Sequence, residues 1–225
     1  MLAIADIVSS DHVNWMTLGR TTIALLAIVD PFGCMPLFLS FTGNLNEAAR
    51  RRTAIIAAIA TAIILIAVAL AGAWVLDLFG IRVASLRVAG GMLLLLIGLS
   101  MLHSRVSSTR QTLEEQREAV EADSVAIVPL AMPLMAGPGA ISLVLADAQR
   151  LPTVAGRAAL VGVIVVVSVV AGLSLLVAEP VAKRLGRTGI NVGTRIMGLI
   201  LAAIAVEMMA NGLTELFPVL AMKAV

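Results

Sequence analysis

The stretch Ala27-Ile-Val-Asp-Pro-Phe-Gly-Cys-Met-Pro-Leu-Phe-Leu-Ser40 places an acid, two prolines and a glycine inside an apolar run long enough to cross a bilayer. A proline inside a helix removes a backbone donor and clashes with the preceding turn, so we expect Pro31 and Pro36 to break this span into two half-helices. Such a break is tolerated at membrane depth only where it is buried in protein or lines a polar cavity. The sequence therefore predicts a site at this break.

The same pattern occurs again in Ala126-Ile-Val-Pro-Leu-Ala-Met-Pro-Leu-Met-Ala-Gly-Pro-Gly-Ala-Ile-Ser142. A shift of 102 positions aligns Pro31 with Pro133, Pro36 with Pro138 and Ser40 with Ser142. These coincidences indicate a duplication. A pair of interrupted apolar segments in corresponding halves is a pointer to the binding site of a transporter.

Composition places the chain in a membrane. Its residues are 60% hydrophobic and 13% charged, with a mean hydropathy of +1.04, whereas about a quarter of the residues of soluble domains are charged. The apolar runs are about 20 or more residues long, which favours helices over the shorter strands of a membrane barrel. We expect an all-α polytopic protein. The single cysteine, Cys34, excludes an internal disulfide.

Six apolar runs predict six transmembrane helices, arranged as three plus three. The predicted spans are 17–42, 53–78, 84–102, 124–148, 158–177 and 191–217. They follow an amphipathic lead-in over 1–16 and are separated by polar turns at 43–52 and 183–187. Residues 1–103 then form the first three-helix repeat, 104–123 a charged linker and 124–225 the second repeat. Because three is odd, the two repeats are inverted relative to each other.

Basic residues predict the orientation. Nine Arg or Lys residues fall in the loops after the first, third and fifth spans, and five fall on the other side. Positive residues favour the cytoplasm, so both termini are expected outside the cytoplasm.

The two motifs carry a family resemblance. Val29-Asp-Pro-Phe-Gly-Cys-Met-Pro36 resembles the first span of the MarC family of bacterial inner-membrane proteins, and Pro133-Leu-Met-Ala-Gly-Pro-Gly-Ala-Ile141 resembles its other signature. Some members are regarded as transporters or exporters of small neutral amino acids such as alanine, glycine, serine and threonine. The resemblance thus implies a secondary transporter of the inner membrane that could work as an exporter. This chain departs from the family at Asp30, where members often have asparagine.

A broken helix offers a partner for each charge of an amino acid. Half-helix N-termini near Pro36 or Pro138 suit a carboxylate, and the C-terminal ends near Val29 and Met132 suit an ammonium or Na⁺. Asp30 adds a full negative charge. The predicted substrate-binding residues are Asp30, Pro31, Gly33, Pro36, Ser40, Pro133, Gly137, Pro138, Gly139 and Ser142.

Several charged residues within the spans leave two readings open. Asp30 and Glu207 are candidates for H⁺ or Na⁺ coupling, because an intramembrane acid is by default a functional hypothesis. Asp30 could instead only cap a half-helix or pair with Arg87 or Arg195, and Glu207 could be a structural partner of Arg195. Arg87 and Arg195 are either supporting charges for the site or arginines that extend to the membrane surface.

Other function classes remain as alternatives. A membrane assembly or interaction protein is the second hypothesis, and an intramembrane enzyme built on Asp30 and Glu207 is the third. No nucleophile and base pattern supports an enzyme, and no His or Met cluster supports a metal. We therefore expect no enzymatic activity, no cofactor and no nucleic-acid partner. The expected partners are a neutral amino acid, a coupling ion, the lipid bilayer and, in an oligomer, a second copy of the chain.

Overall fold

In the computed structural model, the chain is described over residues 15–103 and 135–219. Seven α-helices account for most of this part: α2 (Trp15–Val29), α3 (Pro31–Thr42), α4 (Glu47–Leu78), α5 (Val83–Leu102), α7 (Pro138–Arg150), α8 (Val154–Leu176) and α9 (Ala178–Leu216). The prediction of an all-helical protein is confirmed for these residues.

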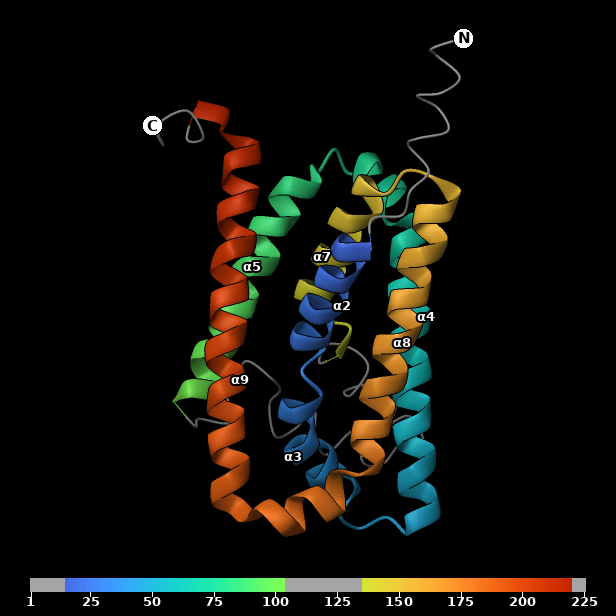
Figure 1. The fold of residues 1–225 in the computed structure, drawn as a ribbon, viewed down its shortest axis with the longest axis vertical. Helices are drawn as coiled ribbons and strands as arrows, with labels where there is room; N and C mark the ends of the chain where they lie inside the picture. The colour runs from blue at the N-terminus through green and yellow to red at the C-terminus, as the bar shows by residue number, and fades with distance from the viewer. Residues whose placement is uncertain (1–14, 104–134, 220–225) are drawn as a thin grey trace.

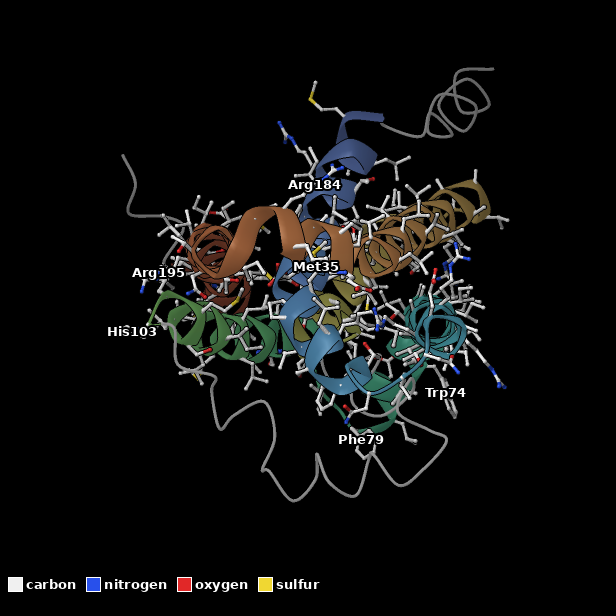
Figure 2. The ribbon with its side chains drawn as sticks, turned by 90° about the horizontal axis from the view of Figure 1, so that it is seen from below. Met35, Trp74, Phe79, His103, Arg184 and Arg195 are labelled. Atoms are coloured by element: carbon white, nitrogen blue, oxygen red, sulfur yellow. The ribbon has the colours of Figure 1, made fainter. Side chains whose placement is uncertain are left out.

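Five segments of the described chain are long and apolar enough to cross a membrane. They are Met16–Thr42, which contains both α2 and α3, Glu47–Leu78, Val83–Leu102, Val154–Leu176 and Thr188–Leu216. Exposed aromatic side chains lie near one end of α4, where Trp74 is 70% exposed and Phe79 71% (Figure 2). The structure thus supports an integral membrane protein. The first half of the predicted fourth span and the linker over 104–123 lie outside the described residues.

Two pairs of long helices surround the broken one. α4 packs along α8 on one side, and α5 packs along α9 on the other (Figure 1). α2 and α3 lie end to end between these pairs, and α7 packs against α4 and α5. The core that joins them includes Leu25, Phe38, Leu65, Ile164 and Leu201.

Small residues permit the close approach of α5 and α9. A Cβ atom on Gly98 would lie 2.7 Å from the carbonyl oxygen of Gly198, and a Cβ on Gly198 would lie 2.8 Å from that of Gly98. The α4 and α8 pair has a related contact, because a Cβ on Gly172 would lie 2.8 Å from the Cβ of Ala58. Backbone contact of this kind is typical of helix packing in membranes.

The first break differs from the prediction in one respect. Pro31 is the first residue of α3, where a proline loses no hydrogen bond that the helix would otherwise make, and Asp30 is its N-cap. Pro36 lies inside α3 and does not break it. The prediction for Pro36 was therefore wrong, because one missing backbone donor within an already capped helix does not have to end it.

Both predicted polar turns are also shorter than expected. α4 begins at Glu47, where the side chain of Asn46 accepts a hydrogen bond from the amide of Ala49 at 2.8 Å and caps the helix. The basic segment 183–187 is largely helical and forms the elbow at the start of α9. Only Gly186 departs from helical geometry, with φ 62° and ψ −178°. A glycine adopts this conformation readily, so the chain turns there with no loop.

Candidate functional site

Asp30 forms the first break. It joins α2 to α3 with a left-handed backbone, φ 46° and ψ 66°, which aspartate tolerates better than most residues. Its Oδ1 accepts a hydrogen bond from the amide of Gly33 at 3.0 Å, and its backbone carbonyl accepts one from the amide of Cys34 at 3.1 Å. The side chain is buried, with 3% of Asp30 exposed. A carboxylate is thus held at the junction of two half-helices.

Gly33 makes this arrangement possible. A Cβ atom at this position would lie 1.9 Å from Oδ2 of Asp30 and 2.8 Å from the terminal carbon of Met101. Any side chain here would push the carboxylate out of its place. Gly33, expected among the substrate-binding residues, therefore makes room for the Asp30 carboxylate.

The second break ends where α7 begins. Gly137 has an extended backbone at the N-cap position and Pro138 is the first residue of the helix, as the proline pattern predicts. No side chain caps this end. The amides of the first turn, which include those of Gly139 and Ala140, have no partner within the helix. These free amides stand at the N-terminal end of α7, which is also the positive end of the helix dipole.

The junction of α2 and α3 meets the start of α7 in one pocket between α2, α3, α5, α7 and α9. The pocket has a volume of about 20 Å³, room for about one water molecule. Figure 1 shows the start of α7 at the level of the α2 and α3 junction. The described residues that line it are Ile28, Val29, Asp30, Cys34, Leu93, Leu94, Ile97, Gly137, Pro138, Gly139, Ala140 and Leu201. Of these, Asp30 alone carries a charged side chain.

Five of the predicted site residues contact or support this pocket. The pocket is lined by Asp30, Gly137, Pro138 and Gly139. Gly33 does not line it, but its amide donates a hydrogen bond to Asp30. Gly139 also lets α5 approach, because a Cβ there would lie 2.4 Å from Leu94.

The remaining predicted residues lie elsewhere. Pro31 is buried at the start of α3, and Pro36 is half-buried within it. Ser40 is exposed and donates to the carbonyl of Leu37 at 2.8 Å. Pro133 lies outside the described residues, as does Met132.

Ser142 does not line the pocket but packs between α7 and α5. It is fully buried and donates to the carbonyl of Leu86 at 3.0 Å. A Cβ on Gly90 would lie 2.2 Å from its hydroxyl oxygen, so the serine occupies the space that Gly90 leaves. The hydroxyl therefore ties α7 to α5.

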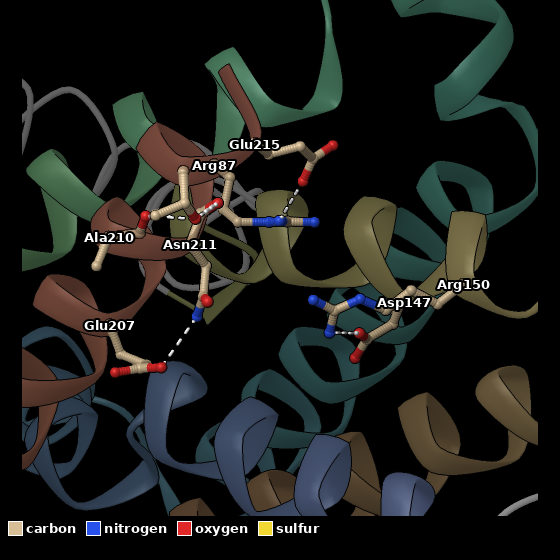
Figure 3. Close-up of polar contacts among 8 residues, drawn as sticks. Arg87, Asp147, Arg150, Glu207, Ala210, Asn211 and Glu215 are labelled. Atoms are coloured by element: carbon tan, nitrogen blue, oxygen red, sulfur yellow. Dashed lines mark hydrogen bonds and ion pairs between the residues drawn. The ribbon is translucent and has the colours of Figure 1, made fainter. Parts of the chain in front are cut away.

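The intramembrane charges occupy different environments. Arg87 is buried, with its side chain 9% exposed, and pairs with Glu215 of α9 at 2.7 Å (Figure 3). Arg195 is exposed. Glu207 is also exposed and accepts a hydrogen bond from the amide nitrogen of Asn211 at 3.0 Å. None of the three lines the pocket.

Sequence reasoning missed a buried acid at the far end of α7. Asp147 is only 3% exposed; its Oδ2 accepts a hydrogen bond from the hydroxyl of Thr21 at 2.7 Å, and Oδ1 is 3.4 Å from Arg150. Asp147 lies near the end of the predicted span 124–148, a position that by sequence alone favours the membrane surface. The contact joins α7 to α2 across 126 positions of sequence, which no local pattern signals.

A second missed contact lies at the opposite end, at the α9 elbow. Glu179 pairs with Arg50 at the start of α4 and with Lys183, whose nitrogen is 2.7 Å away. The hydrogen bond from Lys183 and the charge of Arg50 hold the pKa of Glu179 below its ordinary value. This cluster ties the start of α4 to the turn between α8 and α9.

Within the described ranges, 15–103 and 135–219, no three His, Cys, Asp or Glu side chains gather as a metal site. The pocket thus combines a single carboxylate, the uncapped start of a helix and apolar walls. An arrangement of this kind suits a small solute with one positive and one negative group.

An integral membrane protein in which an interrupted first span and the start of α7 line one central pocket is the class that this fold and site define. The chain belongs to the MarC family of integral membrane proteins, whose family model matches residues 15–217. It is 39% identical over 200 residues to the UPF0056 membrane protein YhcE of Escherichia coli K12, covering 87% of this chain and 91% of that protein.

Two further relatives have similar coverage. A UPF0056 membrane protein of Buchnera aphidicola from Acyrthosiphon pisum is 38% identical over 196 residues, which cover 87% of this chain and 91% of that protein. One from the archaeon Methanocaldococcus jannaschii is 38% identical over 190 residues, covering 84% and 92%. No solved structure matches the chain.

Proposed function

We propose that this protein is a secondary transporter of small neutral amino acids, with one substrate site where the two broken helices meet. The observation that carries the proposal is the pocket itself, in which the Asp30 carboxylate and the uncapped start of α7 line the same space. The pocket must widen to admit an amino acid, as movement of the two halves in alternating access would allow.

The two poles of the pocket take different parts of the substrate. The α7 amides near Gly139 bind the carboxylate, since free N–H groups and the helix dipole both favour an anion. The start of α3 is less suited to this task, because the amide of Gly33 already donates to Asp30. Asp30 binds the ammonium group as a charge-assisted hydrogen-bond acceptor.

The walls select the side chain. Ile28, Leu94, Ile97 and Leu201 are apolar and leave a lysine or glutamate side chain without a partner. An unpaired charge is costly in a low-dielectric site, so such substrates are rejected. Alanine, glycine, serine and threonine fit this description.

An inverted repeat explains how the site is alternately exposed. If α3, α4 and α5 correspond to α7, α8 and α9, a twofold relation requires matching contacts. The contacts match: α7 packs on α4 and α5, while α3 packs on α8 and α9. Rocking of one half against the other around the pocket then gives alternating access.

Coupling and placement complete the proposal. Asp30 is the coupling candidate that lines the pocket, and H⁺ or Na⁺ competes there with the ammonium group; Glu207 lies outside the pocket.

The protein acts in the bacterial inner membrane with both termini outside the cytoplasm, and export is the favoured direction. It is not an enzyme.

Counterflow into alanine-loaded proteoliposomes tests the proposal, with labelled alanine, glycine, serine and threonine outside. The wild type should exchange them. Asp30→Asn keeps a good N-cap that tolerates a left-handed backbone but loses the charge, so exchange should fall about tenfold or more. Pro138→Ala should also impair exchange. Ser40→Ala is the matched control, because Ser40 is exposed away from the pocket, and it should exchange normally. A well-folded wild type that exchanges none of the four would contradict the proposal.

A further inference from the structure

Glu207 lies on the lipid-facing side of a membrane span. It belongs to the candidate span Thr188–Leu216 and is exposed. Residues at helical spacing along the same side, Ile200, Ala203 and Thr214, are exposed as well. The opposite side, with Leu201, Ala205, Met208 and Gly212, is buried. We call the side defined by Ala203, Glu207, Ala210 and Thr214 the outer face of α9.

A polar group on this face has a cost. An acidic residue that faces lipid within a membrane span is unfavourable unless it is paired. Asn211 donates one hydrogen bond to Oε1 of Glu207. The second carboxyl oxygen and the rest of the amide have further hydrogen-bonding capacity that lipid does not satisfy. The outer face therefore requires a partner with polar groups at the same depth.

We propose that the outer face of α9 is the interface with a second copy of this chain. A twofold axis along the membrane normal brings the two α9 helices together in parallel, so each Glu207 and Asn211 pair meets its counterpart at an identical depth. The pair offers both a donor and an acceptor, so it is self-complementary. Hydrogen bonds of this type contribute to helix association in membranes.

The shape of the face fits the same partner. Ala203, Ala210 and Thr214 are small and flank Glu207, which permits close approach of a second helix. α9 stands at the edge of the bundle, with α5 packed on its inner side (Figures 1 and 2). Leu201 reaches the pocket from that inner side, so a dimer formed through the outer face leaves one complete pocket in each copy.

Disulfide cross-linking in native membranes tests the interface. Cys34→Ala removes the single native thiol, and Ala203→Cys or Ala210→Cys then places one thiol on the outer face. Oxidation should give a species of twice the monomer mass. Val166→Cys on α8 and Ile63→Cys on α4 are matched controls, because these side chains are 54% and 62% exposed on other helices. They should give several-fold less dimer.

A second set of variants tests the role of Glu207. Glu207→Gln keeps the hydrogen bonds and should leave cross-linking through Ala203→Cys unchanged, whereas Glu207→Leu should reduce it several-fold. Thermal unfolding distinguishes loss of the interface from misfolding, since leucine on a lipid-facing side leaves the packing of the single chain intact. Equal cross-linking at the control positions, unchanged cross-linking in Glu207→Leu, or a monomer in native membranes would each overturn the proposal. A monomer would mean that lipid or another part of the same chain covers the face.

Discussion

At the scale of single residues, the site depends on a carboxylate held where a helix is interrupted. Asp30 has a left-handed backbone, caps α3 through the amide of Gly33 and lines the pocket. The three properties depend on one another, because the backbone conformation aims the side chain and the cap fixes it. A non-glycine residue in this conformation has a cost of about 1–3 kcal/mol, and such strain is common at functional sites.

Gly33→Ala tests whether this geometry is required. The added Cβ would lie 1.9 Å from the Asp30 carboxylate, so the variant should lose the cap and about 1–3 kcal/mol of stability. For a chain of this size each kcal/mol shifts Tm by about 2–4 °C. Gly19→Ala in α2 is the control, since a Cβ there has open space around it, and its Tm should hold or rise. Equal Tm values for Gly33→Ala and the wild type would contradict the account.

Sequence predicted the residues of the breaks better than it predicted their neighbours. Asp30 and Pro138 could be identified, because an acid or a proline in an apolar span has few uses. Ser40 and Ser142 were aligned by the repeat, yet both hydroxyls bond to backbone carbonyls outside the pocket. Asp147 was missed because its partner Thr21 is distant in sequence.

At the scale of helices, close packing of backbones holds the frame around the pocket. α5 and α9 approach at Gly98 and Gly198, and a Cβ on either would contact the carbonyl oxygen of the other. Backbone atoms cannot move aside as the end of a flexible side chain can. The pocket residues Leu94 and Leu201 sit on these two helices, so their spacing affects the site.

Gly198→Ala should therefore destabilise the protein, by about 1–3 kcal/mol if the cost is that of ordinary overpacking. Its Cβ would lie 2.8 Å from both the carbonyl oxygen of Gly98 and the Cβ of Met101. Gly193→Ala on the same helix has open space and should show no loss. Thermal unfolding of the two purified variants gives the comparison. A Gly198→Ala variant as stable as Gly193→Ala would mean that the helices can separate without cost.

Helix positions followed from the apolar runs, whereas their ends did not. α4 begins inside the predicted turn at 43–52, because Asn46 caps it, and α9 runs through the predicted turn at 183–187, because Gly186 lets it bend without a loop. Arg87 also could not be assigned from sequence. Its partner, Glu215, lies on another helix, and the contact buries a charge that could otherwise have reached the membrane surface.

At the scale of the whole molecule, contacts at opposite ends of the bundle join the two halves of the chain. Thr21 bonds to Asp147 at one end, and Arg50 pairs with Glu179 at the other. Each contact joins a residue before 104 to one after 134. In the proposed rocking motion one end loosens while the other stays closed, so we expect these contacts to control it.

The Glu179 cluster predicts a pH dependence. The pKa of Glu179 is lowered in the folded protein, so the cluster adds stability that is fully present above the ordinary glutamate pKa of 4.5 and is lost as the pH falls through the lowered value. Glu179→Gln should lower Tm at pH 7, and its difference from the wild type should shrink as the pH falls below that range. A difference that is constant from pH 7 to the lowest accessible pH would show that the ion pairs do not supply it.

Binding of labelled alanine to the purified protein, in competition with alaninol and with propionate, tests the central claim most directly. Alaninol keeps the ammonium group without the carboxylate, and propionate keeps the carboxylate without the ammonium group. If Asp30 and the start of α7 hold the two charges together, unlabelled alanine should displace the label, and each analogue should be at least about tenfold weaker. Asp30→Asn should weaken alanine binding, while Ser40→Ala should not. Displacement by either analogue as effective as by alanine, or unchanged binding to Asp30→Asn, would contradict a site formed by the two breaks.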